Sequence, residues 1–88
     1  MLETRIEERL RTVHGLTAAE ARVAVRIGRG ASPKEVAAEL GSSWYTVRSQ
    51  LRQIFSKTER RSQSALTRLV TLLETELALE NAVGQGER

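Results

Sequence analysis

The segment from Ser42 to Lys57 reads SSWYTVRSQLRQIFSK, and it contains all three aromatic residues of the chain. No acidic residue occurs between positions 39 and 59, although the chain has eleven glutamates. A helix over residues 44–58 turns by about 100° per residue, which places Val47, Leu51 and Ile54 on one face. Five polar residues lie on the opposite face, here called the basic face: Tyr45, Arg48, Ser49, Arg52 and Ser56. The segment therefore predicts a helix with an apolar inner face and an acid-free outer one.

The two neighbouring aromatic residues of this helix have different predicted positions. We expect Trp44 to pack on the flank of the apolar face, as Phe55 does, and Tyr45 to point outward. Either of the two serines at positions 42 and 43 supplies a hydroxyl that can cap the start of the helix.

Two shorter helices are predicted before this segment. The first begins at Thr17, which is placed to form a capping box with Glu20, and it ends at Gly28. The second begins at Ser32 and ends before Gly41 after barely two turns. A short helix, a turn with glycine and a basic helix make up a helix-turn-helix, whose second helix enters the major groove of DNA.

Amphipathic helices are predicted on both sides of this unit. Residues 1–15 form a lead-in helix that either caps the domain or links it to a sensor domain. A final helix from residue 62 to about 81 has two apolar stripes, which indicates burial on two sides. The first stripe contains Leu66, Leu69, Val70, Leu73 and Leu77, and the second contains Leu72, Leu79 and Val83.

Two apolar stripes on the final helix favour a homodimer through this helix, because a second copy is the simplest partner for the additional stripe. We assign dimerisation to the five residues of the first stripe. The alternative is that the second stripe covers the lead-in helix. The tail at residues 84–88 is expected to fray. The predicted division is therefore a lead-in helix (1–15), a DNA-binding domain (16–73) and a helical extension with its tail (74–88).

The composition favours helices and argues against several classes of protein. The chain has 88 residues, no aspartate and one proline, and it is rich in good helix formers, so we predict an all-α fold. It has no cysteine, which excludes disulfides and thiolate metal sites. The only histidine, His14, has no obvious partner, so we predict no enzyme activity, metal or cofactor. No secretory signal or membrane-spanning apolar run occurs, which favours a cytoplasmic protein without membrane contacts.

Charge is distributed unevenly along the chain. Residues 1–15 are neutral overall, residues 16–61 have nine Lys and Arg against four Glu, and residues 62–88 have two Arg against four Glu. A basic centre of this kind is suited to a polyanionic partner. Double-stranded DNA is the partner that the basic helix favours. A carboxylate on this helix would be repelled by the DNA phosphates, which explains why the segment has no acidic residue.

Residues 16–70 resemble the LuxR-type DNA-binding domain of bacterial transcription regulators. The similarity rests on Leu16-Thr17 with Glu20, Gly30-Ala31-Ser32, Lys34-Glu35-Val36-Ala37, Leu40-Gly41, Thr46-Val47-Arg48, Ile54-Phe55 and Lys57. The resemblance implies a four-helix fold, here with an extra lead-in helix and a long final helix. In that family the third helix reads DNA and the fourth often dimerises. Six positions differ from the commonest family pattern and leave the DNA target undefined: Ser42, Trp44, Tyr45, Gln50, Thr58 and Glu59.

The resemblance implies base contacts for Arg48, Ser49 and Arg52, which are also on the basic face. We expect phosphate contacts from Lys34, Ser43, Tyr45, Thr46 and Lys57, although helix caps and surface lysines have the same sequence pattern. Tyr45 could equally meet a thymine methyl group. A dimer would read two half-sites about one helical turn apart.

Two other classes of protein use a similar basic helix. A sigma-factor region 4-like module binds promoters while it is held by RNA polymerase, and an interaction module binds an acidic protein. RNA polymerase and a sensor domain are therefore further candidate partners. The spacing after Lys57 favours the LuxR type over the sigma-factor module.

Overall fold

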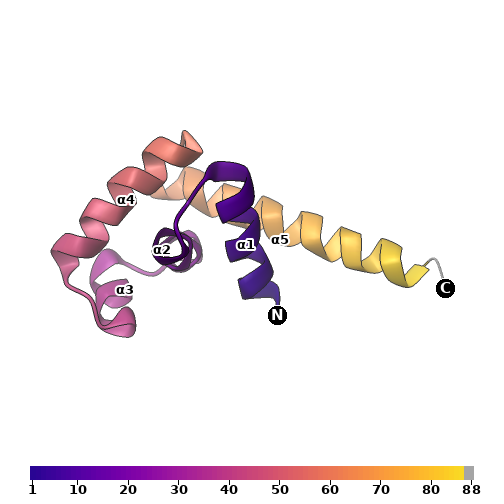
Figure 1. Ribbon diagram of the computed structural model, residues 1–88, viewed down its shortest axis with the longest axis horizontal. Helices are drawn as coiled ribbons and strands as arrows, with labels where there is room; N and C mark the ends of the chain where they lie inside the picture. Colours follow the sequence, from indigo (N-terminus) through magenta and orange to yellow (C-terminus); the bar gives the residue numbers. More distant parts are fainter. Residues whose placement is uncertain (87–88) are drawn as a thin grey trace.

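The computed structural model describes residues 1–86, with side chains to residue 82. This part of the chain forms five α-helices (Figure 1): α1 (Leu2–His14), α2 (Ala18–Gly28), α3 (Pro33–Leu40), α4 (Trp44–Thr58) and α5 (Gln63–Gly86). The predicted all-α class is confirmed for these residues. Within them, no helix combines the length and the apolar character needed to cross a membrane.

The central helix of the molecule is α2, which packs against each of the other four. It begins with the predicted capping box: the Glu20 amide donates to Thr17 Oγ1 at 3.1 Å, and the Thr17 amide donates to Glu20 Oε1 at 2.9 Å. Val23, Ala24 and Ile27, which share one face of the helix, are buried. Ala21 and Val25 are buried as well, because α2 is covered on more than one side.

A short connection joins α3 to α4 and fixes where α4 starts. Gly41 ends α3 in the left-handed region, at φ 64°, which costs glycine little because it has no Cβ. Ser43 then caps α4. Two residues of α3, Val36 and Ala37, are buried. Val47, Leu51 and Ile54 are buried on the predicted inner face of α4.

The lead-in helix belongs to the same core as the rest of the chain. Ile6 and Leu10 of α1 are fully buried, and α1 packs against both α2 and α5, crossing α5 in Figure 1. At the other end, Leu77 is also buried. The hydrophobic core therefore extends beyond the predicted domain limits of 16 and 73 in both directions, and α1 caps the domain.

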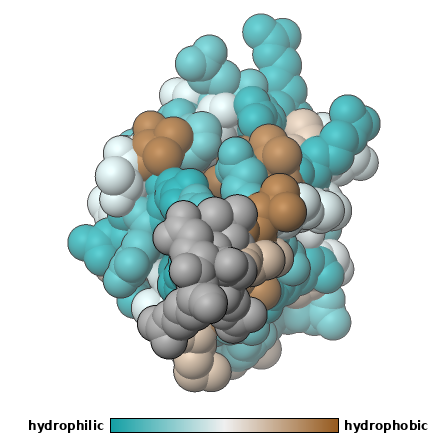
Figure 2. All heavy atoms as spheres, turned by 90° about the vertical axis from the view of Figure 1, so that its right-hand side faces the viewer, coloured by the Kyte–Doolittle hydropathy of each residue, from teal (hydrophilic) through white to brown (hydrophobic). Residues whose placement is uncertain are grey.

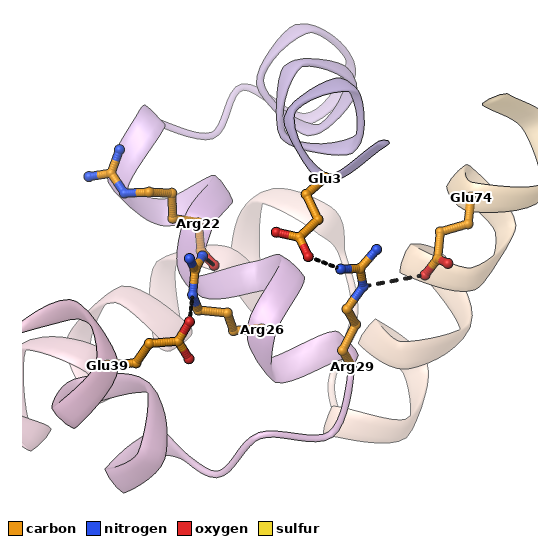
Figure 3. A network of polar contacts seen from close by, with 6 residues as sticks. All are labelled: Glu3, Arg22, Arg26, Arg29, Glu39 and Glu74. Atoms are coloured by element: carbon orange, nitrogen blue, oxygen red, sulfur yellow. Dashed lines mark hydrogen bonds and ion pairs between the residues drawn. The ribbon is translucent and has the colours of Figure 1, made fainter. Parts of the chain in front are cut away.

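Ion pairs at the end of α2 and in the turn that follows it join this part of the chain to its neighbours (Figure 3). Arg29 bonds to Glu3 of α1 and lies 3.7 Å from Glu74 of α5, measured from Nε to Oε1. Arg26 Nε lies 2.9 Å from Glu39 Oε1 of α3. The arginines at positions 26 and 29 thus form ion pairs with carboxylates from three other helices.

The structure revises the assignment of dimerisation residues. All five residues of the first α5 stripe are buried inside a single chain: Leu66, Leu69, Val70, Leu73 and Leu77. Their side chains are therefore not exposed for contact with a second copy. Leu72 and Leu79 of the second stripe are 53% and 61% exposed, so they do not cover α1 as the alternative proposed. The third member, Val83, lies outside the described side chains.

The far end of α5 projects past α1 (Figure 1). The helix continues to Gly86 rather than ending near residue 81, so the first residues of the predicted frayed tail are helical, while residues 87–88 lie outside the described part. Seen from this end, the molecule is mainly hydrophilic, with hydrophobic residues in several small groups (Figure 2).

The crossing of α2 and α5 is close because position 28 has no side chain. A Cβ built on Gly28 would lie 2.5 Å from Val70 Cγ2 and 3.0 Å from Val70 Cβ. Valine in a helix is stiff at χ1, so Val70 cannot easily turn away. The helix packing therefore depends on glycine at this position.

We expect Gly28→Ala to lower the free energy of unfolding. Overpacking costs about 1–3 kcal/mol. Alanine gains roughly 1 kcal/mol over glycine only in a helix interior, and Gly28 is the last residue of α2, so this gain offsets the cost only in part. Urea unfolding of a double-mutant cycle with Val70→Ala provides the test, because the shorter side chain relieves the clash. In the Val70→Ala background the loss should be smaller or reversed. An equal effect in both backgrounds would contradict the close crossing.

Candidate nucleic-acid interface

The basic face of α4 is exposed along its whole length. Each of its five residues is solvent-exposed, including the three predicted base contacts Arg48, Ser49 and Arg52. Val47 and Leu51, which alternate with them, are buried against the rest of the domain. Arg48 and Arg52 are one helical turn apart and therefore lie side by side on the same face.

Within residues 1–82, the guanidinium groups of this face have no carboxylate partners. The ion pairs found among residues 1–82 use Arg5, Arg9, Arg26, Arg29 and Lys57. Neither Arg48 nor Arg52 takes part in one. Their positive charge is therefore available to an external anion, whereas much of the charge on α1 and α2 is paired within the protein.

The first turn of α4 presents an aromatic cluster instead of a buried tryptophan. Trp44 is 38% exposed and, unlike Phe55, is not among the partly buried residues that pack against the core, so the prediction that it packs on the flank of the apolar face is wrong. Its ring lies under the Arg48 guanidinium, with Cζ 5.1 Å from the ring centroid, and it meets the Tyr45 ring edge-on at 5.1 Å. Because Trp44 is the first residue of α4, its side chain lies beside the helix start rather than over the core. A cation–π contact at an exposed site contributes about 0.5–1 kcal/mol.

Two of the predicted phosphate contacts shape the start of α4. The Thr46 amide donates to Ser43 Oγ at 3.0 Å, and the Ser43 hydroxyl lies 2.9 Å from Thr46 Oγ1. Both side chains are exposed, so they cap the helix at the surface next to the basic face. Tyr45 is 78% exposed, as predicted, and Lys34 is exposed at the start of α3.

The remaining predicted phosphate contact, Lys57, has a partner inside the protein. Its Nζ lies 2.8 Å from Glu20 Oε1, and Glu20 has only 9% of its side chain exposed. Burial by itself raises the pKa of Glu20, but the hydrogen bonds from Lys57 and from the Thr17 amide together lower that pKa below its ordinary value. We therefore place Lys57 as the residue that ties the end of α4 to the start of α2, instead of as a phosphate contact.

One residue beside the basic face was missed by the sequence analysis. Arg61, between α4 and α5, borders the same cleft as Arg48 and Arg52. The only sequence signal is its position just after the basic helix, and the direction of the chain after residue 58 cannot be derived from helical periodicity.

Comparisons with known proteins gave no match to this chain among protein-family models, curated proteins or solved structures.

We expect the Glu20–Lys57 pair to make stability depend on acid pH. The pKa of Glu20 is lower in the folded state than its ordinary value of 4.5. Its contribution is therefore present above pH 4.5 and is lost as the pH falls through the folded-state pKa. We expect urea unfolding between pH 7 and pH 3 to show that the free energy of unfolding falls less with decreasing pH in Glu20→Gln than in the unchanged protein.

The corresponding substitution of the lysine in this ion pair is Lys57→Met. It should lower the free energy of unfolding at pH 7 by about 1–3 kcal/mol, because a mostly buried carboxylate loses a charged hydrogen bond. Lys34→Met is the control, since Lys34 is exposed and forms no ion pair within residues 1–82; changes at such sites are usually within about 0.5 kcal/mol. Equal effects of the two lysine variants would contradict the structural role of Lys57.

Proposed function

We propose that this protein is a bacterial transcription regulator that binds double-stranded DNA through a LuxR-type helix-turn-helix formed by α3 and α4. In this proposal it acts in the cytoplasm and α4 lies in the major groove. The observation that carries the proposal is the basic face of α4: it is exposed, has no acidic residue, and has two guanidinium groups that form no ion pair within residues 1–82.

The chemistry of that face suits base recognition. A guanidinium can donate two parallel hydrogen bonds to O6 and N7 of guanine, and such a pair discriminates by about 1–3 kcal/mol against the wrong base. Arg48 and Arg52, one turn apart, have the spacing to reach neighbouring base pairs, with Ser49 between them. Trp44 holds the Arg48 guanidinium beside the start of α4, at the end of the helix that enters the groove.

Contacts to the phosphates would place α4 in its register. Ser43, Thr46, Tyr45 and Lys34 are exposed near the starts of α4 and α3 and can donate to phosphate oxygens. The pairing of Lys57 with Glu20 removes that lysine from the set. Binding should therefore depend steeply on salt, because each neutralised phosphate releases condensed counterions.

A dimer remains part of the proposal, through a different surface. Leu72 and Leu79 are exposed and seven residues apart, so they share one face of α5. Two copies joined along this face would present two α4 helices to half-sites separated by about one helical turn of DNA. RNA polymerase or a sensor domain would be further partners of such a regulator.

The test begins with selection of bound sequences from random duplex DNA. We expect one enriched sequence with higher affinity than random DNA, and affinity for both should fall linearly on a log–log plot against salt. Arg48→Ala and Arg52→Ala should each reduce the ratio of specific to random affinity by about 5- to 150-fold. The control is Arg11→Ala, which removes an exposed arginine from α1 and should leave the ratio unchanged.

Three outcomes would contradict the proposal. If the protein retains no duplex DNA at low salt, the basic face serves an acidic protein partner instead. If Arg48→Ala and Arg52→Ala both keep full preference for the selected sequence, α4 does not read bases. If binding to DNA requires core RNA polymerase, the sigma-factor alternative is supported.

A further inference from the structure

A cleft of about 430 Å³ lies along one side of α4. Its walls come from four parts of the chain: the end of α2, the start of α3 at Pro33, the flank of α4 and the start of α5. The apolar part of the wall includes Phe55. Three arginines line the same space: Arg48, Arg52 and Arg61.

The positive charge of this cleft is not balanced from inside. Among the described lining residues there is no carboxylate, and none of the three arginines has an ion pair within residues 1–82. Three like charges around one space repel one another, and an anion in the cleft would relieve that repulsion. Arg26 and Arg29, by contrast, each meet glutamates (Figure 3).

The backbone that bears Arg61 is held in place next to α4. The Gln63 side-chain amide donates to the Ile27 carbonyl at the end of α2, at 3.3 Å. The Ser62 hydroxyl accepts from the Ala65 amide at 3.1 Å and so fixes the first turn of α5. The Arg60 amide bonds to the Phe55 carbonyl at 3.1 Å. Arg61 therefore has a defined position across the cleft from α4, although its side chain is exposed.

We propose that this cleft receives the sugar–phosphate backbone of one strand of the DNA that α4 reads, and that Arg61 binds one of its phosphodiester groups. This inference rests on the proposed function. The cleft is bordered by the two arginines assigned to the bases, so a strand read by Arg48 and Arg52 passes its edge. Arg61 would set the register of α4 on the DNA without reading sequence.

The lining favours a phosphate backbone over a small anionic ligand. Small-molecule sites orient their ligand with a few convergent polar groups in a mostly enclosed pocket. Within the described side chains, no buried nitrogen or oxygen atom lacks a hydrogen-bond partner. The cleft therefore has no buried polar atom left free to orient a small ligand. Its polar lining consists of three exposed arginines together with Ser62 and Gln63. Guanidinium groups match the row of phosphates along a strand.

The test compares two adjacent arginines by their effect on the salt dependence of DNA binding. In Arg61→Ala, affinity for the selected and for random duplexes should fall by the same factor, and the log–log slope against salt should decrease by about 0.9. The control is Arg60→Ala, which removes the same charge at the neighbouring position. Arg60 does not line the cleft, and its guanidinium donates to the Thr58 carbonyl at 3.3 Å. The log–log slope of Arg60→Ala against salt should stay closer to that of the unchanged protein.

The outcomes separate this inference from the proposed function. If the unchanged protein binds its selected duplex but Arg61→Ala keeps the full slope, the cleft does not hold a phosphate and base reading by α4 still stands. If the unchanged protein binds no duplex at low salt, the proposed function itself fails. Saturable binding of inorganic phosphate or ATP that depends on Arg61 and does not compete with DNA would also overturn the inference. Thermal unfolding by circular dichroism shows whether each variant is folded.

Discussion

Burial of Val47, Leu51 and Ile54 is the interaction on which the rest of the arrangement depends. These residues fix the rotation of α4 about its own axis, because each fully buried aliphatic side chain contributes about 1.5–3 kcal/mol. With this face held against the domain, the opposite one must point to solvent. Arg48 and Arg52 are therefore exposed as a consequence of core packing, and the Glu20–Lys57 pair ties down the far end of the same helix.

The distribution of acidic residues then decides which arginines remain available. Glutamates on α1, α3 and α5 meet arginines of α1, of α2 and of the turn after α2, so charge on that side of the molecule supports the packing of helices. The stretch between residues 39 and 59 has no acid, so α4 cannot pair its own arginines. The same chain thus uses arginine in two ways, as an internal partner of glutamate and as an open site for an anion.

Much of the fold could be predicted because it depends on local chemistry. Capping boxes at Thr17 and Ser32 and the αL glycine at position 41 are readable from short motifs, and helical periodicity identified the inner face of α4. The wrong predictions concern which part of the protein, if any, covers a given helix face. Spacing groups the first stripe of α5 together, but it does not show that α1 and α2 cover it within one chain. For the same reason, the exposure of Trp44, the pairing of Lys57 and the position of Arg61 required the tertiary structure.

The most direct test of the central claim is a titration of the ¹⁵N-labelled protein with a duplex selected from random DNA, followed by amide chemical shifts. We expect the largest changes at Arg48, Ser49 and Arg52, and small changes at the amides of residues 76–82 near the far end of α5. Unchanged shifts along the basic face, with the DNA-dependent changes located on α1 or α5 instead, would contradict the account.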